Sequence, residues 1–479
     1  MTDDRYRSPL GARYASPAMQ RLWGERYRIG LWRRTWLALA ESEQELGIAI
    51  PDEALAQMRA HLDDADLNAA AAYEKRFRHD VMAHVHQFGD QAPAAKPFLH
   101  LGATSAYVTD NADVLVIRDS LRLVLGRLIA VLDAFDRFAR THAALPCLAY
   151  THFQPAQLTT VGKRATLWMQ DLGLDVEDVA YRIENIRLRG CKGTTGTQAS
   201  FLELFKGDHA KVRDLERRIA EKLGIPRVFP VTGQTYSRKA DAAILDILSG
   251  VSQSCAKMGT DLRLLQHEGE LLEPFESEQI GSSAMAYKRN PMRAERVCGL
   301  ARFVISLASN TANTAATQWL ERTLDDSANR RLVLPEAFLA TDAILVLATN
   351  IAAGIEVRPE TIRRHLDEQM PFMATERLLM LGVEAGGDRQ ALHEVIRTNS
   401  LAAAERVSKG GPNDLLERLA GDHTFARVPP QSLKAELNPA LYTGRAEQQV
   451  GEFLTEYMKP LLERARPLAA KATEAEVVV

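Results

Sequence analysis

The sequence predicts an all-α protein organised around a long bundle of helices. The first indication is a stretch without proline, 98–145, in which apolar residues recur at alternating spacings of three and four. This stripe consists of Val114, Ile117, Leu121, Val124, Leu128, Val131, Phe135 and Phe138. Because the stripe is sustained over about four heptads, it indicates a long bundle helix, whereas a surface helix of a globular domain carries a shorter one.

A second stretch, 237–267, has the same pattern, and few segments resemble strands. Its apolar stripe consists of Ile244, Ile247, Val251, Cys255, Met258, Leu262 and Leu265. Residues 156–189, 292–315 and 327–353 are also helix-like. Five long helices with short connections predict an elongated bundle. The segments RVFPVTG and YTHF are expected to be short extended pieces at most.

Shorter and more interrupted helices are expected on both sides of the bundle. Before residue 111, the candidates are 19–46 and 51–60. After Gly354 the helical pattern breaks, and a proline stands early in a new helix. We therefore expect three domains: an N-terminal helical domain at 1–104, the central bundle at 105–357 and a C-terminal helical domain at 358–479.

Composition and charge favour a soluble protein. The net charge is -3 and neither half is strongly basic, which disfavours nucleic-acid binding. The four cysteines stand far apart, which disfavours a zinc or disulfide framework and fits a reducing compartment. The N-terminus lacks the apolar segment of a secretory signal, and the most apolar long run, 343–355, is too short to span a bilayer. We expect a cytoplasmic protein with no membrane or nucleic-acid partner.

Four stretches depart from the amphipathic pattern and carry polar residues of functional types. The first, KRFRHDVMAHVH, contains Arg78, His79 and Asp80, followed by His84 and His86. Neither histidine pair has the spacing of metal ligands on one helix face, so a metal site is not expected. Two alternatives stay open, namely a buried structural histidine cluster and an anion contact by Arg78 and His79.

The second and third stretches place polar residues next to expected helix starts. In HLGATSAYVTDN, Thr104 and Ser105 either cap the following helix or offer hydroxyls and amides to an anion. In YTHFQPAQLTTVGKR, His152 stands at an element end, and Pro155 is expected to start a helix. A histidine in that position is suited to proton transfer near neutral pH, although a lone histidine is more often structural.

The fourth stretch is the segment QIGSSAMAYKRNPM at 279–292, together with ERTLDDSANRR at 321–331. The first segment is neither a phosphate loop nor a nucleophile elbow. In the second segment, Arg322 precedes Ser327 and Arg331, which stand one helical turn apart, so the three could clamp an anion. The alternative is a solvated helix start capped by Asp325 or Asp326.

These stretches carry a family resemblance. GSSAMAYKRNP resembles the signature loop of the fumarase/aspartase superfamily, G-S-x-x-M-x-x-K-x-N. Within it, the chain resembles the animal-type adenylosuccinate lyase family through YRSPLGARYASP, RHDVMAHVH, HLGATS, THFQPAQLTTVGKR, KGTTGTQASF, TGQTY, ERTLDDSANRR, PFMATE and TGRAEQQV. One departure is Ala286, where close relatives are expected to have proline.

The resemblance implies a fold, a reaction and an assembly. The fold is the three-domain fumarase/aspartase-like fold with a long central helix bundle. The reactions are cleavage of adenylosuccinate to AMP and fumarate, and of the succinylated ribotide SAICAR to AICAR and fumarate, both in purine synthesis. The resemblance also implies that no metal or organic cofactor is needed. The expected assembly is a homotetramer whose active sites each gather residues from three subunits.

The resemblance further implies roles for individual residues. Ser282 is expected to be the general base and His152 the general acid, with His79 assisting His152 and Lys288 stabilising the charged intermediate. A serine hydroxyl needs help to act as a base, and loop amides and the Lys288 ammonium can favour its alkoxide. The expected substrate contacts are Arg13, Tyr14, Arg78, His79, Asp80, Thr104, Ser105, Thr151, Gln234, Asn290, Arg296, Arg322, Ser327 and Arg331.

Two alternatives to this function remain open from the sequence. A sister lyase such as argininosuccinate lyase, aspartase, fumarase or a carboxymuconate cycloisomerase shares the signature loop. A non-catalytic helical scaffold is the other, and it predicts loss of Ser282, His152 or Lys288, all of which are present. Because the loop is rich in small residues, we also expect Gln279 to Asn290 to be mobile until substrate binds.

Overall fold

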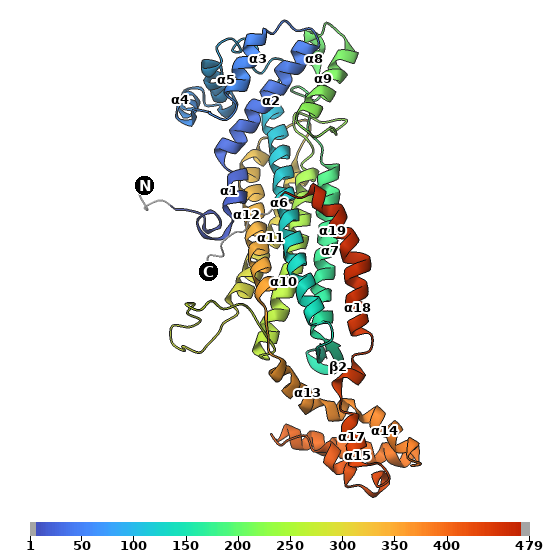
Figure 1. The fold of residues 1–479 in the computed structure, drawn as a ribbon. Helices are drawn as coiled ribbons and strands as arrows, with labels where there is room; N and C mark the ends of the chain where they lie inside the picture. The colour runs from blue at the N-terminus through green and yellow to red at the C-terminus, as the bar shows by residue number, and fades with distance from the viewer. Residues whose placement is uncertain (1–5, 471–479) are drawn as a thin grey trace.

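A computed structural model describes residues 6–470 and confirms the all-α prediction (Figure 1). The molecule is elongated, with long helices in its middle and shorter helices at both ends. In the described part of the chain there are nineteen α-helices and two small antiparallel sheets. The long central helices are α6 (Ser105–Thr141), α7 (Val161–Asn185), α10 (Lys239–His267), α11 (Met292–Thr317) and α12 (Asp325–Gly354).

Shorter helices form the two ends. The N-terminal group consists of the π-helix η1 (Leu10–Tyr14), α1 (Pro17–Leu22), α2 (Glu25–Glu45), α3 (Asp52–Ala60), α4 (Leu67–Phe77) and α5 (Asp80–Gln91), joined by α8 (Ala199–Leu204) and α9 (His209–Lys222). The C-terminal helices are α13 (Pro359–Met373), α14 (Thr375–Glu384), α15 (Arg389–Ser408), α16 (Leu415–Ala420), α17 (Pro430–Ala435), α18 (Ala446–Glu452) and α19 (Lys459–Ala465). Of these, α18 and α19 return along the bundle.

The predicted apolar stripes form the core of the bundle. All eight stripe residues of α6 are buried, from Val114 to Phe138. They belong to one continuous cluster with apolar side chains of α7, α10, α11 and α12. A second cluster joins α2 to α6, α8 and α9, and a third lies within α14 to α17. Burial of these apolar surfaces is the main stabilising contribution to such a fold.

Helix α12 is long and apolar enough to cross a membrane by length and composition alone. However, 72% of its apolar window is buried inside the protein. Its buried side chains, among them Phe338, Ile344 and Ile351, pack in the bundle core. We therefore interpret α12 as a core helix.

One local prediction was wrong, because Pro155 does not start a helix. It lies in β2 (Gln154–Thr160), which pairs antiparallel with β1 (Pro146–Thr151). Proline is tolerated there because each strand of a two-stranded sheet has a free edge. Helix α7 starts only at Val161, where the Thr160 side chain accepts a hydrogen bond from the Lys163 N–H at 3.1 Å. The second sheet pairs β3 (Leu271–Leu272) with β4 (Glu356–Val357).

Candidate active site

The first group of candidate residues gathers where α5, α6 and α12 begin. His79 is the N-cap of α5, and its Nδ1 accepts a hydrogen bond from the Met82 N–H at 3.4 Å. In the neutral ring the proton then lies on Nε2, which faces the Ser105 hydroxyl at 3.3 Å. Arg331 reaches across from α12 and donates to Asp80 at 2.8 Å. Four of the predicted contacts therefore lie together.

Two further candidates border this group. Arg78 ends α4 with a φ of 57°, in the left-handed region, and its side chain is exposed. Thr104 occupies the N-cap position of α6, yet its side chain makes no capping hydrogen bond. Its hydroxyl is thus available to a ligand, which favours the anion-binding alternative over simple capping.

The neighbouring histidines are structural, as one of the sequence alternatives proposed. His84 is buried edge-on against Trp32, and burial lowers its pKa to about 4. His86 stacks on Tyr73 and contacts Phe77. Within residues 6–470, no group of three or more His, Cys, Asp or Glu side chains could hold a metal ion.

The second group surrounds the start of α12. Arg322 donates to Asp326 at 2.9 Å, and Asp326 also accepts from Arg238 at 2.6 Å. Asp326 therefore forms ion pairs with two arginines. Neither Asp326 nor Asp325 caps α12, whose N-cap is Leu324. The capping alternative for this segment is wrong. The i, i+4 spacing of Arg322 and Asp326 is the sequence signal that could have revealed this pair.

Arg330 and Arg331 have different surroundings although they are adjacent. Arg330 is buried and binds Asp241 at 2.7 Å, Asp113 at 2.9 Å and the Tyr236 hydroxyl at 2.7 Å. These contacts tie α12 to α6 and α10, so Arg330 is structural. Arg331 is exposed on the next position of the helix, as an anion contact requires.

Gln234 lies beside this segment. Its backbone N–H donates to the carbonyl of Glu321 at 2.9 Å, and its side-chain amide donates to the carbonyl of Thr194 at 3.1 Å. A Cβ on Gly233 would lie 2.5 Å from the Glu321 oxygen, so only glycine permits this approach. The loop of Gln234 is thereby held against the start of α12.

A third group combines η1 and α11. The Arg296 guanidinium lies over the Tyr14 ring, 5.4 Å from its centroid. Arg13 precedes Tyr14 and is exposed. The cation–π contact holds the Arg13–Tyr14 turn against the bundle.

The loop before α11 presents Ser282 in an unusual setting. The Ser282 Oγ accepts hydrogen bonds from the N–H groups of Ala284 at 3.3 Å and Met285 at 3.1 Å. Asn290 closes the loop by donating to the Gly281 carbonyl at 2.7 Å. A Cβ on Gly281 would lie 2.1 Å from the Lys288 carbonyl oxygen, so this turn also requires glycine. Lys288 is exposed.

His152 occupies the turn of the β1–β2 hairpin. Both turn residues are in the left-handed region, with φ of 54° at His152 and 57° at Phe153. Such a turn favours Asn and Gly, so two bulky residues store strain there. Strain of this kind concentrates at functional sites. The His152 side chain is exposed, next to Thr151 at the end of β1.

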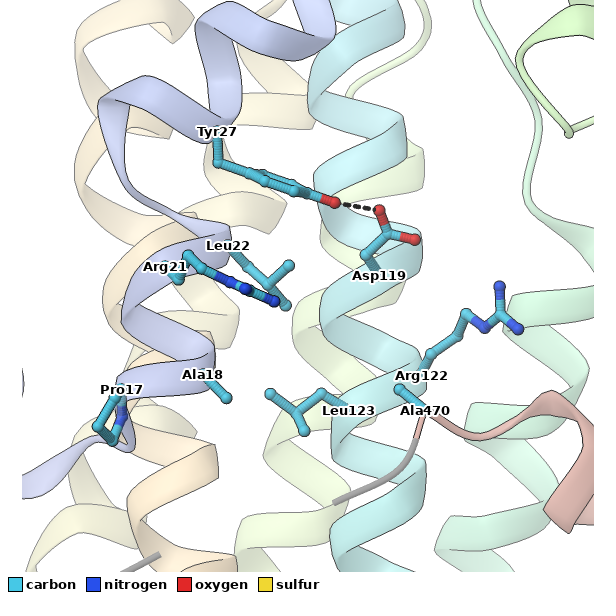
Figure 2. A pocket seen from close by; sticks show the side chains of 9 residues that line it. All are labelled: Pro17, Ala18, Arg21, Leu22, Tyr27, Asp119, Arg122, Leu123 and Ala470. Carbon is cyan, nitrogen blue, oxygen red and sulfur yellow. Dashed lines mark hydrogen bonds between the residues drawn. The ribbon is translucent and has the colours of Figure 1, made fainter. Parts of the chain in front are cut away.

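A single chain does not bring all these groups together. Helix α5 lies at one end of the bundle, the β1–β2 hairpin lies toward the other end near α13, and the loop before α11 projects from the side (Figure 1). A cavity of about 650 Å³ lies between α1, α2 and α6 (Figure 2). None of the predicted site residues lines it. One chain therefore offers several separate parts of a site.

Two family models and several known proteins match the sequence of this chain. A family model described as "Lyase" matches residues 19–306, and one described as "Adenylosuccinate lyase C-terminus" matches residues 371–453. The adenylosuccinate lyase of Saccharomyces cerevisiae is 51% identical over 455 residues, which cover 94% of each chain. That of Schizosaccharomyces pombe is 46% identical over 476 residues, which cover 98% of each chain.

Solved structures share the fold at lower identity. The 3-carboxy-cis,cis-muconate lactonizing enzyme from Pseudomonas putida matches with a TM-score of 0.80 at 24% identity, covering 96% of this chain and 99% of that chain. A fumarate lyase from Mesorhizobium sp. BNC1 matches with a TM-score of 0.78 at 25% identity, covering 92% and 98%. These matches confirm the expected fold.

Proposed function

Since this chain belongs to the adenylosuccinate lyase family of the fumarase/aspartase superfamily, we propose that Ser282 and His152 are its general base and general acid. The proposed reactions release fumarate from adenylosuccinate, leaving AMP, and from SAICAR, leaving AICAR. The observation that carries the assignment of the base is the pair of backbone N–H groups on the Ser282 oxygen. Both donors favour the alkoxide, the form that can remove a proton.

The elimination needs two proton transfers. Ser282 takes the proton from the succinyl carbon next to a carboxylate, and the electron pair of the C–H bond is delocalised onto that carboxylate. The pair then forms the C=C bond of fumarate while the C–N bond breaks, and His152 delivers a proton to the leaving nitrogen. Lys288 and Asn290 stabilise the carboxylate charge as it develops.

The remaining candidates bind the three anionic groups of the substrate. Arg13, Tyr14, Arg78 and Asp80 meet the nucleotide and its phosphate, while Thr104, Ser105, Thr151 and Gln234 contact the succinyl part. Arg296, Arg322, Ser327 and Arg331 complete the anion contacts. His79 contacts the substrate and assists His152. Guanidinium groups suit this task because they bind carboxylate and phosphate with two parallel hydrogen bonds.

We propose that the complete site forms in a homotetramer, with residues from three subunits. The candidate groups lie far apart in the folded single chain, which supports this proposal. So does the apolar surface exposed around α11 and the start of α12, where Trp319 and Leu320 are 67% and 93% exposed. Phe303, Ile305, Leu324 and Leu332 are exposed in the same region. Several large apolar side chains exposed on neighbouring segments are typical of a surface that a protein partner covers.

The cytoplasm is the proposed location. All four cysteines are buried and free, although an oxidising compartment would favour disulfides in an extracellular protein.

Fumarate release from a panel of substrates tests the proposed activity. The purified protein is assayed by the ultraviolet absorbance of fumarate with adenylosuccinate, SAICAR, argininosuccinate and aspartate. We expect fumarate only from the two purine substrates. Release from argininosuccinate or aspartate at a higher kcat/KM would instead assign the chain to a sister activity.

A further inference from the structure

A second cavity lies between the end of α7, the start of α10 and α6, and it holds none of the candidate catalytic or substrate-binding residues. Its volume is about 370 Å³. Three cationic side chains line it, namely Arg182, Arg187 and Lys239. Pockets of about 300–1,000 Å³ are of the size that small molecules occupy.

These three cations have no counter-ion among the side chains that the structure describes. Across residues 6–470, neither a hydrogen bond nor an ion pair engages the side chain of Arg182, Arg187 or Lys239. The Nε of Arg182 is buried without a hydrogen-bonding partner. A buried donor left unpaired is destabilising, so it favours a ligand that can accept a hydrogen bond.

The one acidic side chain that lines the cavity already has two partners. Asp241 accepts from the Tyr236 hydroxyl at 2.6 Å and from Arg330 at 2.7 Å. It is therefore not available to pair with the three cations. The local charge of the cavity is positive, although the chain as a whole carries a net charge of -3.

The start of α10 adds to this positive potential. Lys239 is the first residue of this 29-residue helix, and the N-cap Arg238 provides no side-chain cap. The helix dipole and the backbone N–H groups at such a terminus favour an oxyanion, while the Ala240 N–H already donates to the Ser237 carbonyl at 3.0 Å. Ser237, which also lines the cavity, offers a hydroxyl beside them.

Apolar side chains complete the lining. Val114, Ile117 and Ile244 form one wall, and Phe229 lies stacked on Tyr236 with ring centroids 5.8 Å apart. We propose that this cavity is a second anion site, separate from the catalytic site, which binds a phosphate monoester of a small apolar or planar molecule. The cations and the helix start receive the phosphate, and the apolar wall receives the rest.

Calorimetric titration with phenyl phosphate tests the proposal on the full-length protein. We expect two binding sites per chain, because the candidate substrate site also accepts phosphate. The double variant Arg182→Gln/Lys239→Gln should weaken one of them at least tenfold. Arg213→Gln removes an exposed arginine that does not line the cavity, and it should leave both sites intact. Parallel titration with inorganic phosphate should show weaker binding, since it lacks the apolar group.

The two sites can be told apart by a third variant. Arg331→Gln should weaken binding at the candidate substrate site and leave binding at the new site unchanged. If the substrate-site assignment is wrong, Arg331→Gln has no effect on phosphate binding; if this proposal is wrong, the double variant has none. One site in the unmodified protein, unchanged by the double variant, would overturn the proposal. Loss of the oligomer in the double variant, seen by light scattering without any change in phosphate binding, would also overturn it, because the cations would then serve a subunit contact.

Discussion

Asn290 donates its side-chain amide to the carbonyl oxygen of Gly281 at 2.7 Å, which closes the loop that presents Ser282. The bond links the two ends of the loop, nine positions apart, just before α11 begins. Asn290→Ala should lower kcat by roughly 10- to 100-fold, because loss of a partly buried hydrogen bond of about 1–3 kcal/mol lets the loop move the base out of position.

The matched control is Asn313→Ala, an exposed position on α11. It should keep kcat within about twofold, and both variants should melt within a few degrees of the unmodified protein, since neither change touches the core. Full activity of Asn290→Ala in the fumarate assay would show that loop closure does not depend on this bond.

The two serines of the loop should respond differently to substitution. Ser282 accepts two backbone N–H groups, whereas the Ser283 side chain is exposed and engages no other described residue. Ser282→Ala should lower kcat by roughly a thousandfold with little effect on substrate binding. Ser283→Ala should retain most activity. The reverse order of the two variants would move the base assignment to Ser283.

The same loop should become ordered when substrate binds. Hydrogen exchange at the N–H groups of Ala284 and Met285 should be fast in free Ser282→Ala, and it should slow when adenylosuccinate is added to the same variant, which binds without turnover. Slowing reflects closure of the loop over the ligand. Equal exchange with and without substrate would contradict the gating role.

Glu43 gives the fold a pH dependence. It is buried in α2, neither carboxylate oxygen has a hydrogen-bonding partner in the described chain, and burial raises its pKa to about 9. Between 4.5, the ordinary pKa, and about 9 the folded protein holds a proton that the unfolded chain releases. Raising the pH through that window therefore destabilises the fold, by at most about 1.4 kcal/mol per pH unit.

Glu43→Gln should remove the pH dependence that Glu43 causes. In urea unfolding, the free energy of unfolding of Glu43→Gln, relative to that of the unmodified protein, should therefore rise as the pH increases from 5 toward 9. Glu45→Gln on the same helix is the control. Glu45 pairs with Arg218 and Lys222, which lower its pKa, so its loss should reduce stability slightly at neutral pH. A difference between Glu43→Gln and the unmodified protein that stays constant with pH would show that Glu43 is ionised in the fold.

Sequence patterns predicted the long helices well because packing and periodicity agree there. The stripe from Val114 to Phe138 is buried along its whole length. The β1–β2 hairpin could not be predicted in the same way. Pro155 is typical of a helix start, and the turn residues His152 and Phe153 are not those that normally mark a hairpin. Tertiary context sets their conformation.

The candidate site could be predicted only in part from the sequence. Motif spacing indicated which residue types matter, but the pairing of Arg331 with Asp80 joins positions 251 residues apart. The separate roles of Arg330 and Arg331 depend on which side of α12 is buried. The proposed assembly of the full site from several subunits rests on contacts between chains, which no periodicity within one chain encodes.

Mixing two inactive variants tests the central claim most directly. Ser282→Ala and His152→Ala are each purified, shown to be inactive, then mixed in equal amounts, dissociated and reassembled. If base and acid come from different subunits, random assembly restores about a quarter of the sites. We therefore predict that fumarate release recovers to about a quarter of the unmodified rate. No recovery, despite mixed tetramers demonstrated by mass spectrometry, would contradict the shared site formed by Ser282 and His152.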